Sequence, residues 1–84
     1  MILGKIVGNV VASQKVKSIV GLKLLLVQPL YSDREAVFVA ADMVGAGLGE
    51  VVLVTSGEPA QNTLEKKPPI DALIVGIVDD ATSL

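Results

Sequence analysis

Residues 41–54 read Ala-Asp-Met-Val-Gly-Ala-Gly-Leu-Gly-Glu-Val-Val-Leu-Val, so that a glycine-rich loop passes directly into an apolar run. Glycine loops that bind dinucleotides follow a strand and open a helix, where the pyrophosphate meets the helix N-terminus. A Walker-type loop needs Lys-Ser or Lys-Thr after its glycines, and none follows here. The run 50–54 instead predicts a strand. The glycines therefore indicate a loop whose side chains are small because something packs closely on it.

The rest of the chain repeats this strand pattern. Each apolar run is rich in Val, Ile or Leu and is bounded by Gly, Pro, Asp or Ser, which is typical of strands. Only segment 58–64 is predicted to form a helical turn or two, with Pro59 near its start. An all-β protein follows, with a small five-stranded OB-like β-barrel favoured over a sandwich. The predicted strands are 2–13, 22–30, 36–42, 50–56 and 70–79.

The first predicted strand has one continuous apolar face. Positions 2, 4, 6, 8, 10 and 12 are Ile, Gly, Ile, Gly, Val and Ala, whereas the odd positions mix apolar residues with Lys5 and Asn9. Because side chains alternate along a strand, the even positions are predicted to face the core. Gly4 and Gly8 on that face predict a sharp bend or a close backbone approach, as a small closed barrel requires.

Three other predicted strands are apolar on both faces, at 24–27, 51–54 and 72–78. Strands of this kind usually belong to sheets that helices cover on both sides. The sequence offers almost no helix, so we expect neighbouring subunits to supply the cover. An oligomer is therefore predicted, and the alternative is a monomeric barrel with a partly apolar surface.

Length and composition limit the remaining possibilities. The 84 residues are enough for one domain, spanning 1–84. The longest unbroken apolar stretch, 72–78, is far shorter than the ~20 residues that span a bilayer, so no membrane contact is expected. The first residues, Met-Ile-Leu-Gly-Lys, lack the separate basic region of a signal peptide, and a cytoplasmic protein is expected.

The residues available for catalysis are few. The chain contains no histidine, the usual base near neutral pH, and no cysteine, the commonest strong nucleophile. Asp42 and Glu50 flank the glycine loop and could be an acid/base pair, but we favour a role in binding the loop amides. Asp79-Asp80 could attract a cation, although a solvated end is the simpler interpretation. No catalytic residue, metal site or cofactor is predicted, and the protein is not expected to be an enzyme.

The alternative function on fold grounds is binding of nucleic acid or a small ligand by an OB-type oligomer. Single-strand binding requires aromatic platforms in a positive groove. The net charge is −2, Tyr31 and Phe38 are the only aromatic residues, and Arg34 is the only arginine. We therefore expect no nucleic-acid partner.

The chain resembles the EutN/CcmL-type vertex proteins of bacterial microcompartments over nearly its whole length. Residues 3–15 and 21–30 resemble the family's first two strands, and 69–79 resemble its last. Residues 41–54 resemble the family's most distinctive stretch. Four segments in order, at matching spacing, make the resemblance specific.

This resemblance implies an OB-like protomer, a homopentamer, and a place in the shell of a cytoplasmic bacterial microcompartment. Such pentamers form the vertices of a polyhedral shell whose other tiles are hexameric or pseudohexameric shell proteins. A flat hexagonal layer cannot close without pentagonal units, so the implied function is geometric closure.

The glycine loop is the candidate packing and assembly site, through Gly45, Ala46, Gly47, Gly49 and Glu50. A branched side chain at Gly47 is expected to weaken assembly. The chain also departs from the family's usual pattern: Gln61 stands where the family has an arginine, and the connection 31–35 is short. These departures leave the character of any pore undetermined.

Overall fold

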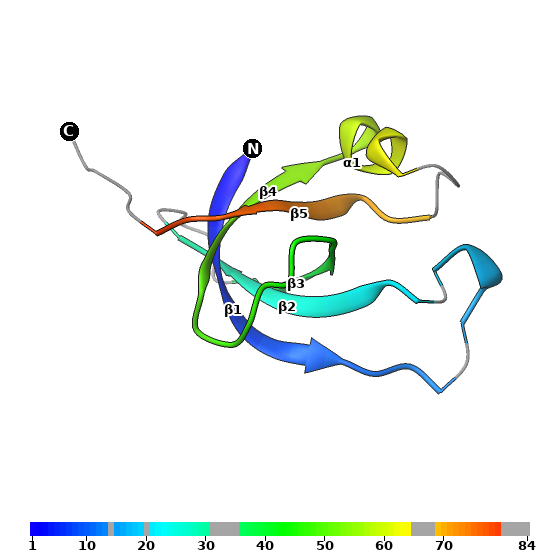
Figure 1. Ribbon diagram of the computed structural model, residues 1–84, viewed down its shortest axis with the longest axis horizontal. Coiled ribbons are helices and arrows are strands. Elements are labelled where there is room, and N and C mark those ends of the chain that lie inside the picture. The colour runs from blue at the N-terminus through cyan, green and yellow to red at the C-terminus, as the bar shows by residue number, and fades with distance from the viewer. Residues whose placement is uncertain (14, 20, 31–35, 65–68, 80–84) are drawn as a thin grey trace.

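The computed structural model describes residues 1–13, 15–19, 21–30, 36–64 and 69–79, in which five strands close into a barrel (Figure 1). The order around the barrel is β1-β2-β3-β5-β4, and every neighbouring pair is antiparallel except β3 and β5. Each predicted apolar run contains one strand, so the predicted all-β, five-stranded barrel is confirmed. The strands are β1 (Ile2–Val10), β2 (Lys23–Pro29), β3 (Phe38–Asp42), β4 (Val51–Ser56) and β5 (Ala72–Ile77).

Two short helices lie in the connections. The α-helix α1 (Glu58–Thr63) follows β4 and carries Pro59 in its first turn, where proline's missing N–H leaves no bond unmade. This helix was predicted from the sequence. The 3-10 helix η1 (Lys17–Ile19) precedes β2 and was not predicted, because three residues are too few to show a helical period.

The barrel interior is filled by aliphatic side chains from all five strands. Ile6, Leu25, Val27, Val52 and Ile74 are fully buried there. Burial of such a side chain stabilises the fold by roughly 1.5–3 kcal/mol. A Cβ atom at Gly4 would overlap Val27 Cγ1 and would lie 3.2 Å from the carbonyl oxygen of Gln28. The predicted close approach at Gly4 is therefore confirmed.

The predicted inward face of β1 is wrong beyond Ile6. Ile6 lies opposite Val27, but Gly8 lies opposite Leu26 and the register shifts between the two pairs. The extra residue, Val7, forms a bulge, and a bulge reverses the alternation of side chains along the strand. Because directly paired residues share a face, Gly8 points outward with Leu26 and not into the core.

The outer face of the barrel is covered in part by the chain itself. Ala60 of α1 is buried against Leu73 of β5 and Ala41 of β3, and Leu64 packs at the edge of this cluster. The expectation that only neighbouring subunits could cover the outer face is therefore wrong for this region. The cover is incomplete, because Val39 on the outer face of β3 remains 45% exposed.

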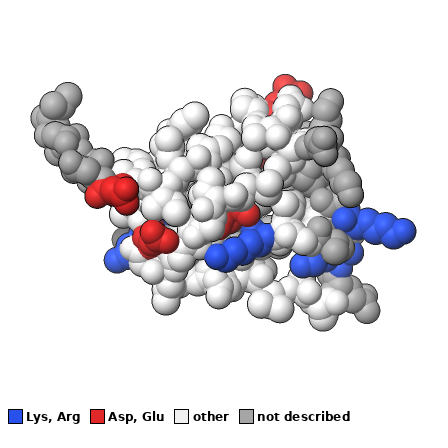
Figure 2. Space-filling view, in the orientation of Figure 1, with Lys and Arg blue, Asp and Glu red and all other residues white. Residues whose placement is uncertain are grey.

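Most of the surface on one side of the molecule is uncharged (Figure 2). Basic side chains gather toward the end where segment 11–19 lies, which contains the exposed Lys15 and Lys17. Within the described ranges, no helix has the length and apolar character needed to cross a membrane.

Candidate functional site

The glycine loop closes one end of the barrel between β3 and β4. Ala46 is fully buried and belongs to the same apolar cluster as Ile6, Leu25 and Val52. A larger side chain at this position would displace the core residues beneath it. Ala46 is therefore small because it packs into its own barrel, and it does not face another subunit.

Asp42, the last residue of β3, holds the first half of the loop. Its carboxylate accepts hydrogen bonds from the backbone N–H groups of Val44 at 2.9 Å and Ala46 at 2.7 Å. Asp42 is 5% exposed; its bond to Ala46 is buried and its bond to Val44 is partly buried. A carboxylate that accepts two backbone amides satisfies donors that burial would otherwise leave unpaired.

Lys23, the first residue of β2, ties the loop to a neighbouring strand. Its ammonium group donates a hydrogen bond to the carbonyl oxygen of Ala46 at 2.7 Å. The same nitrogen lies 3.9 Å from Asp42 Oδ2. Asp42 thus accepts from the backbone N–H of Ala46 while Lys23 donates to its backbone carbonyl, and together they fix the loop over the barrel end.

The second half of the loop is fixed by its own residues and by β1. Glu50 Oε1 accepts a hydrogen bond from the N–H of Gly47 at 2.7 Å, and the N–H of Glu50 donates to the carbonyl of Gly47 at 3.1 Å. The N–H of Gly49 donates to the carbonyl of Ile6 at 2.9 Å. The loop is therefore anchored to β1, β2 and β3 at the same time.

Two loop glycines have a backbone conformation that other residues adopt only with strain. The φ angles of Gly45 and Gly49 are +84° and +86°, and no atom lies within 4 Å of a Cβ built at either position. These residues are glycine because of φ and not because of crowding. Gly47 has no positive φ, and a Cβ there would meet only Glu50 Oε1, at 3.3 Å.

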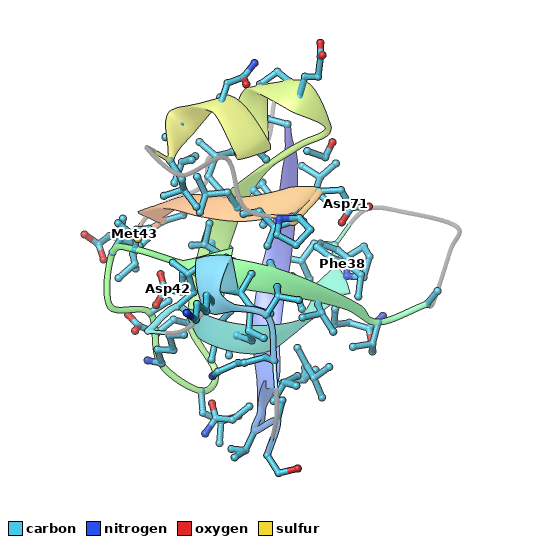
Figure 3. The ribbon with its side chains drawn as sticks, turned by 90° about the vertical axis from the view of Figure 1, so that its right-hand side faces the viewer. Phe38, Asp42, Met43 and Asp71 are labelled. Carbon is cyan, nitrogen blue, oxygen red and sulfur yellow. The ribbon has the colours of Figure 1, made fainter. Side chains whose placement is uncertain are left out.

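The loop presents apolar side chains that the sequence analysis did not single out. Leu48 is 76% exposed, Met43 is 60% exposed and Val44 is 43% exposed. We refer to Met43, Val44 and Leu48 as the loop tip; Met43 is labelled in Figure 3. The signal in the sequence was the presence of large apolar residues between glycines, where a solvated turn would carry polar ones.

The two loop carboxylates both accept hydrogen bonds from backbone amides of the loop. Asp42 binds the amides of Val44 and Ala46, and Glu50 binds that of Gly47, which confirms the interpretation favoured from the sequence. The glycines also lead into strand β4, as predicted, and not into a helix that could hold a phosphate. Among the described residues, no three acidic side chains are grouped closely enough to hold a metal ion.

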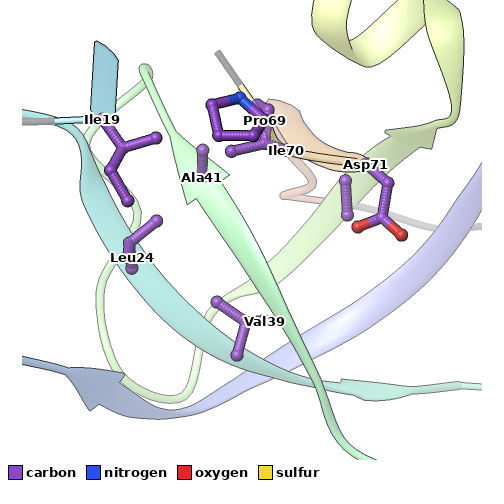
Figure 4. A pocket seen from close by; sticks show the side chains of 8 residues that line it. Ile19, Leu24, Val39, Ala41, Pro69, Ile70 and Asp71 are labelled. Carbon is purple, nitrogen blue, oxygen red and sulfur yellow. The ribbon is translucent and has the colours of Figure 1, made fainter. Parts of the chain in front are cut away.

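A second apolar feature lies on the outer face, beside the seam between β3 and β5. These strands pair only at Ala41 with Leu73 and at Asp42 with Ile74. Next to this short pairing lies a groove of about 190 Å³, with side chains of η1 and β2 on one side and of residues 69–72 on the other (Figure 4). We call it the seam groove; the residues used below are Ile19, Leu24, Val39, Ala41, Ile70 and Asp71.

Several residues discussed from the sequence lie outside the described part of the chain. These are the connection 31–35, which contains Tyr31 and Arg34, and Asp80. Gln61 lies within α1, and its side chain is outside the described part of the structure.

Comparison with known proteins gives one consistent family. The family model described as "Ethanolamine utilisation protein EutN/carboxysome" matches residues 1–79. The chain is 45% identical over 84 residues to the bacterial microcompartment shell vertex protein GrpN of Rhodospirillum rubrum, covering 94% of this chain and 93% of that protein. It is 43% identical over 83 residues to the carboxysome shell vertex protein CcmL of Gloeobacter violaceus, covering 94% and 83%.

Solved structures show the same relationship. The GrpN pentameric microcompartment shell protein from Rhodospirillum rubrum superposes with a TM-score of 0.87 at 40% identity, covering 100% of this chain and 99% of that one. The likeness therefore extends over the whole barrel, including the glycine loop.

Proposed function

The chain belongs to the EutN/CcmL family, and from this premise we propose that five copies of it form a vertex of a bacterial microcompartment shell. The observation that carries the proposal is the full-length likeness to a pentameric shell protein. The role is structural: the family consists of shell vertex proteins and not enzymes, and the loop carboxylates here are bound to backbone amides.

The protomer has the properties that a rigid tile needs. Its glycine loop is fixed by bonds to three strands, and its surface carries apolar residues on a fixed backbone. We propose that the loop region 43–50 is an assembly surface, either between protomers or toward a neighbouring tile. Gly45, Gly47, Gly49 and Glu50 shape this surface, Ala46 anchors it to the barrel, and the loop tip supplies its apolar contacts.

We also propose that the pentamer's partners are hexameric or pseudohexameric shell proteins in the bacterial cytoplasm. A layer of hexagonal tiles closes into a polyhedron only where five-fold units replace six-fold ones. Such contacts require the edges of the pentamer to match those of a flat tile, and a rigid small barrel suits this geometry better than a flexible one.

Native mass spectrometry of the purified chain tests the proposed function. We expect a species of five subunits at micromolar concentration. Coexpression with hexameric shell proteins should then give closed particles by electron microscopy, whereas the hexameric proteins alone should give open sheets or tubes. A monomer or dimer in native mass spectrometry would contradict the proposal.

Binding of nucleic acid is not proposed. Phe38 is half-buried against the barrel core, and the net charge is −2, so the chain has no basic surplus to neutralise phosphates. Phosphate-driven binding is strongest at low salt, so fluorescence anisotropy of short single strands at low salt is the appropriate test. We expect no saturable change in anisotropy.

A further inference from the structure

We propose that the loop tip of one protomer docks into the seam groove of the next protomer in the ring. This inference rests on the proposed function, because it assumes that the functional unit is a closed ring of identical chains. In such a ring every contact is heterologous, so that each chain must carry two unlike surfaces that complement one another. The loop tip and the seam groove are a pair of this kind.

The loop tip has the properties of a protruding contact. Leu48, Met43 and Val44 are 76%, 60% and 43% exposed. The backbone that carries them is held at Ala46, Gly47 and Gly49 by the hydrogen bonds described above. Little conformational freedom is therefore lost when the loop is bound, which favours association by preorganisation.

The seam groove has the properties of the matching concave surface. Its lining is apolar on both sides, from Ile19 and Leu24 to Ile70. Val39 of β3 also lines it and remains 45% exposed (Figure 4). Its volume of about 190 Å³ leaves room for a leucine side chain. Filling the groove would bury the part of the outer face of β2 and β3 that α1 leaves uncovered.

The loop tip lies far from one end of the seam groove within the same chain. In Figure 3, Met43 of the loop tip and Asp71 of the seam groove lie on opposite sides of the view, although Ala41, another groove residue, is only two residues before Met43. A contact between the loop tip and the Asp71 end of the groove must therefore join two molecules. Repeated from chain to chain, a contact between surfaces that face different directions turns each subunit relative to the last, as ring closure requires.

The charges at the edges of the two surfaces are complementary. Asp71 is the only charged residue among the described residues that line the seam groove. Lys23 lies beside the loop, where its side chain is 51% exposed and its ammonium group uses one donor on Ala46. A lysine has three donors, so Lys23 can approach the partner's acidic edge while it still holds the loop.

Chemical cross-linking tests this contact directly, because the chain contains no cysteine and only introduced thiols can react. The variant carrying both Leu48→Cys and Val39→Cys is treated with a short bismaleimide and separated on a denaturing gel. We expect a ladder that extends to five linked chains. The single variants Leu48→Cys and Val39→Cys are the matched controls, and neither should form a ladder.

A second variant measures the contribution of the loop tip to assembly. Leu48→Asp should raise the concentration at which the ring half-dissociates by at least tenfold, while its circular dichroism and melting of the subunit stay unchanged because Leu48 is exposed. Val11→Asp places the same charge at a residue that is 93% exposed and outside both surfaces, and it should leave the ring intact.

The outcomes separate this inference from the proposed function. If the unmodified chain is not pentameric in native mass spectrometry, the proposed function is wrong. If the chain is pentameric, but the double-cysteine variant yields only unlinked or internally linked chains, the docking contact is wrong and the vertex role stands. A Leu48→Asp variant that keeps the normal ring would likewise overturn the docking contact.

Discussion

In β1, Gly4 is glycine because the barrel interior leaves no room for a side chain, whereas in the loop Gly49 has open space around its Cα. A Cβ at Gly4 would overlap Val27 Cγ1, while a Cβ at Gly49 would have no neighbour within 4 Å. Gly49 is instead required by its φ of +86°. Glycine is thus required in β1 by the lack of space and in the loop by the backbone conformation.

This difference reflects the different interactions that stabilise the barrel and the loop. The barrel is stabilised by apolar burial, which depends on volume and tolerates little overlap. The loop is stabilised by bonds from Asp42, Lys23 and Glu50 to loop backbone groups, which depend on the position of single atoms. Substitutions in the barrel should therefore affect the whole fold, and those in the loop should affect the loop and the contacts that it makes.

The largest loss in the free energy of unfolding is expected for Gly4→Val. The added atoms would be forced against Val27, a stiff and fully buried side chain, and against the carbonyl of Gln28. Overpacking of this kind typically destabilises a fold by about 1–3 kcal/mol, and we expect the upper end of this range. Urea denaturation followed by circular dichroism measures the change.

Gly76→Ala is the matched control for Gly4→Val. Gly76 also lies in a strand, but a Cβ there would lie 3.9 Å from Leu53 Cβ, which is ordinary contact. Its free energy of unfolding should change by less than about 0.5 kcal/mol. Equal destabilisation by the two changes would show that the interior is not the more tightly packed region.

A smaller loss in the free energy of unfolding is expected for Asp42→Ala. The change leaves the N–H groups of Val44 and Ala46 without their acceptor, and the latter is fully buried. An unsatisfied buried donor costs about 1–3 kcal/mol, and we expect a loss of about 2 kcal/mol in unfolding free energy. Hydrogen exchange at Ala46 should accelerate more than exchange in β2.

Asp42→Asn is the matched variant for this prediction, because it retains one oxygen acceptor of the same shape. Its destabilisation should be smaller than that of Asp42→Ala. If the two variants lose equal stability, the hydrogen bonds do not account for the role of Asp42.

A still smaller loss of folding stability is expected for Gly49→Ala. No atom obstructs the new methyl group, so the whole effect is the strain of a non-glycine residue at positive φ, roughly 1–2 kcal/mol. Thermal unfolding of this variant should show a lower midpoint with an unchanged circular dichroism spectrum. An unchanged midpoint would mean that the loop relaxes to another conformation at little cost.

The strands were predictable from the sequence because each is a short run of Val, Leu and Ile between turn residues. The bulge at Val7 was not predictable, since nothing in the alternation of β1 distinguishes an inserted residue from a regular one. The correct face of Gly8 depends on its pairing with Leu26, which is a contact between distant parts of the chain.

The candidate site was predicted in position but not in detail. The glycines marked the loop, and the roles of Asp42 and Glu50 followed from their places beside it. The burial of Ala46 depends on where the loop folds over the barrel, which local sequence does not specify. The exposure of Leu48 was not predicted, although a large apolar residue between two glycines is its signal in the sequence.

The smallest effect on folding is expected for Gly47→Ala, and it is the change that distinguishes folding from assembly most cleanly. Gly47 lacks a positive φ, and its new Cβ would meet only Glu50 Oε1, at 3.3 Å, on an exposed side chain that can move. The free energy of unfolding should stay within about 0.5 kcal/mol of the parent value.

Gly47 also directly precedes Leu48, so an added methyl group should alter the fit of the loop tip. Light scattering after dilution should then show the ring dissociating at a higher concentration, with a larger shift for Gly47→Val. If neither variant changes the dissociation of the ring, no neighbouring chain approaches the loop at Gly47, and the part of the assembly surface assigned to this glycine must be withdrawn.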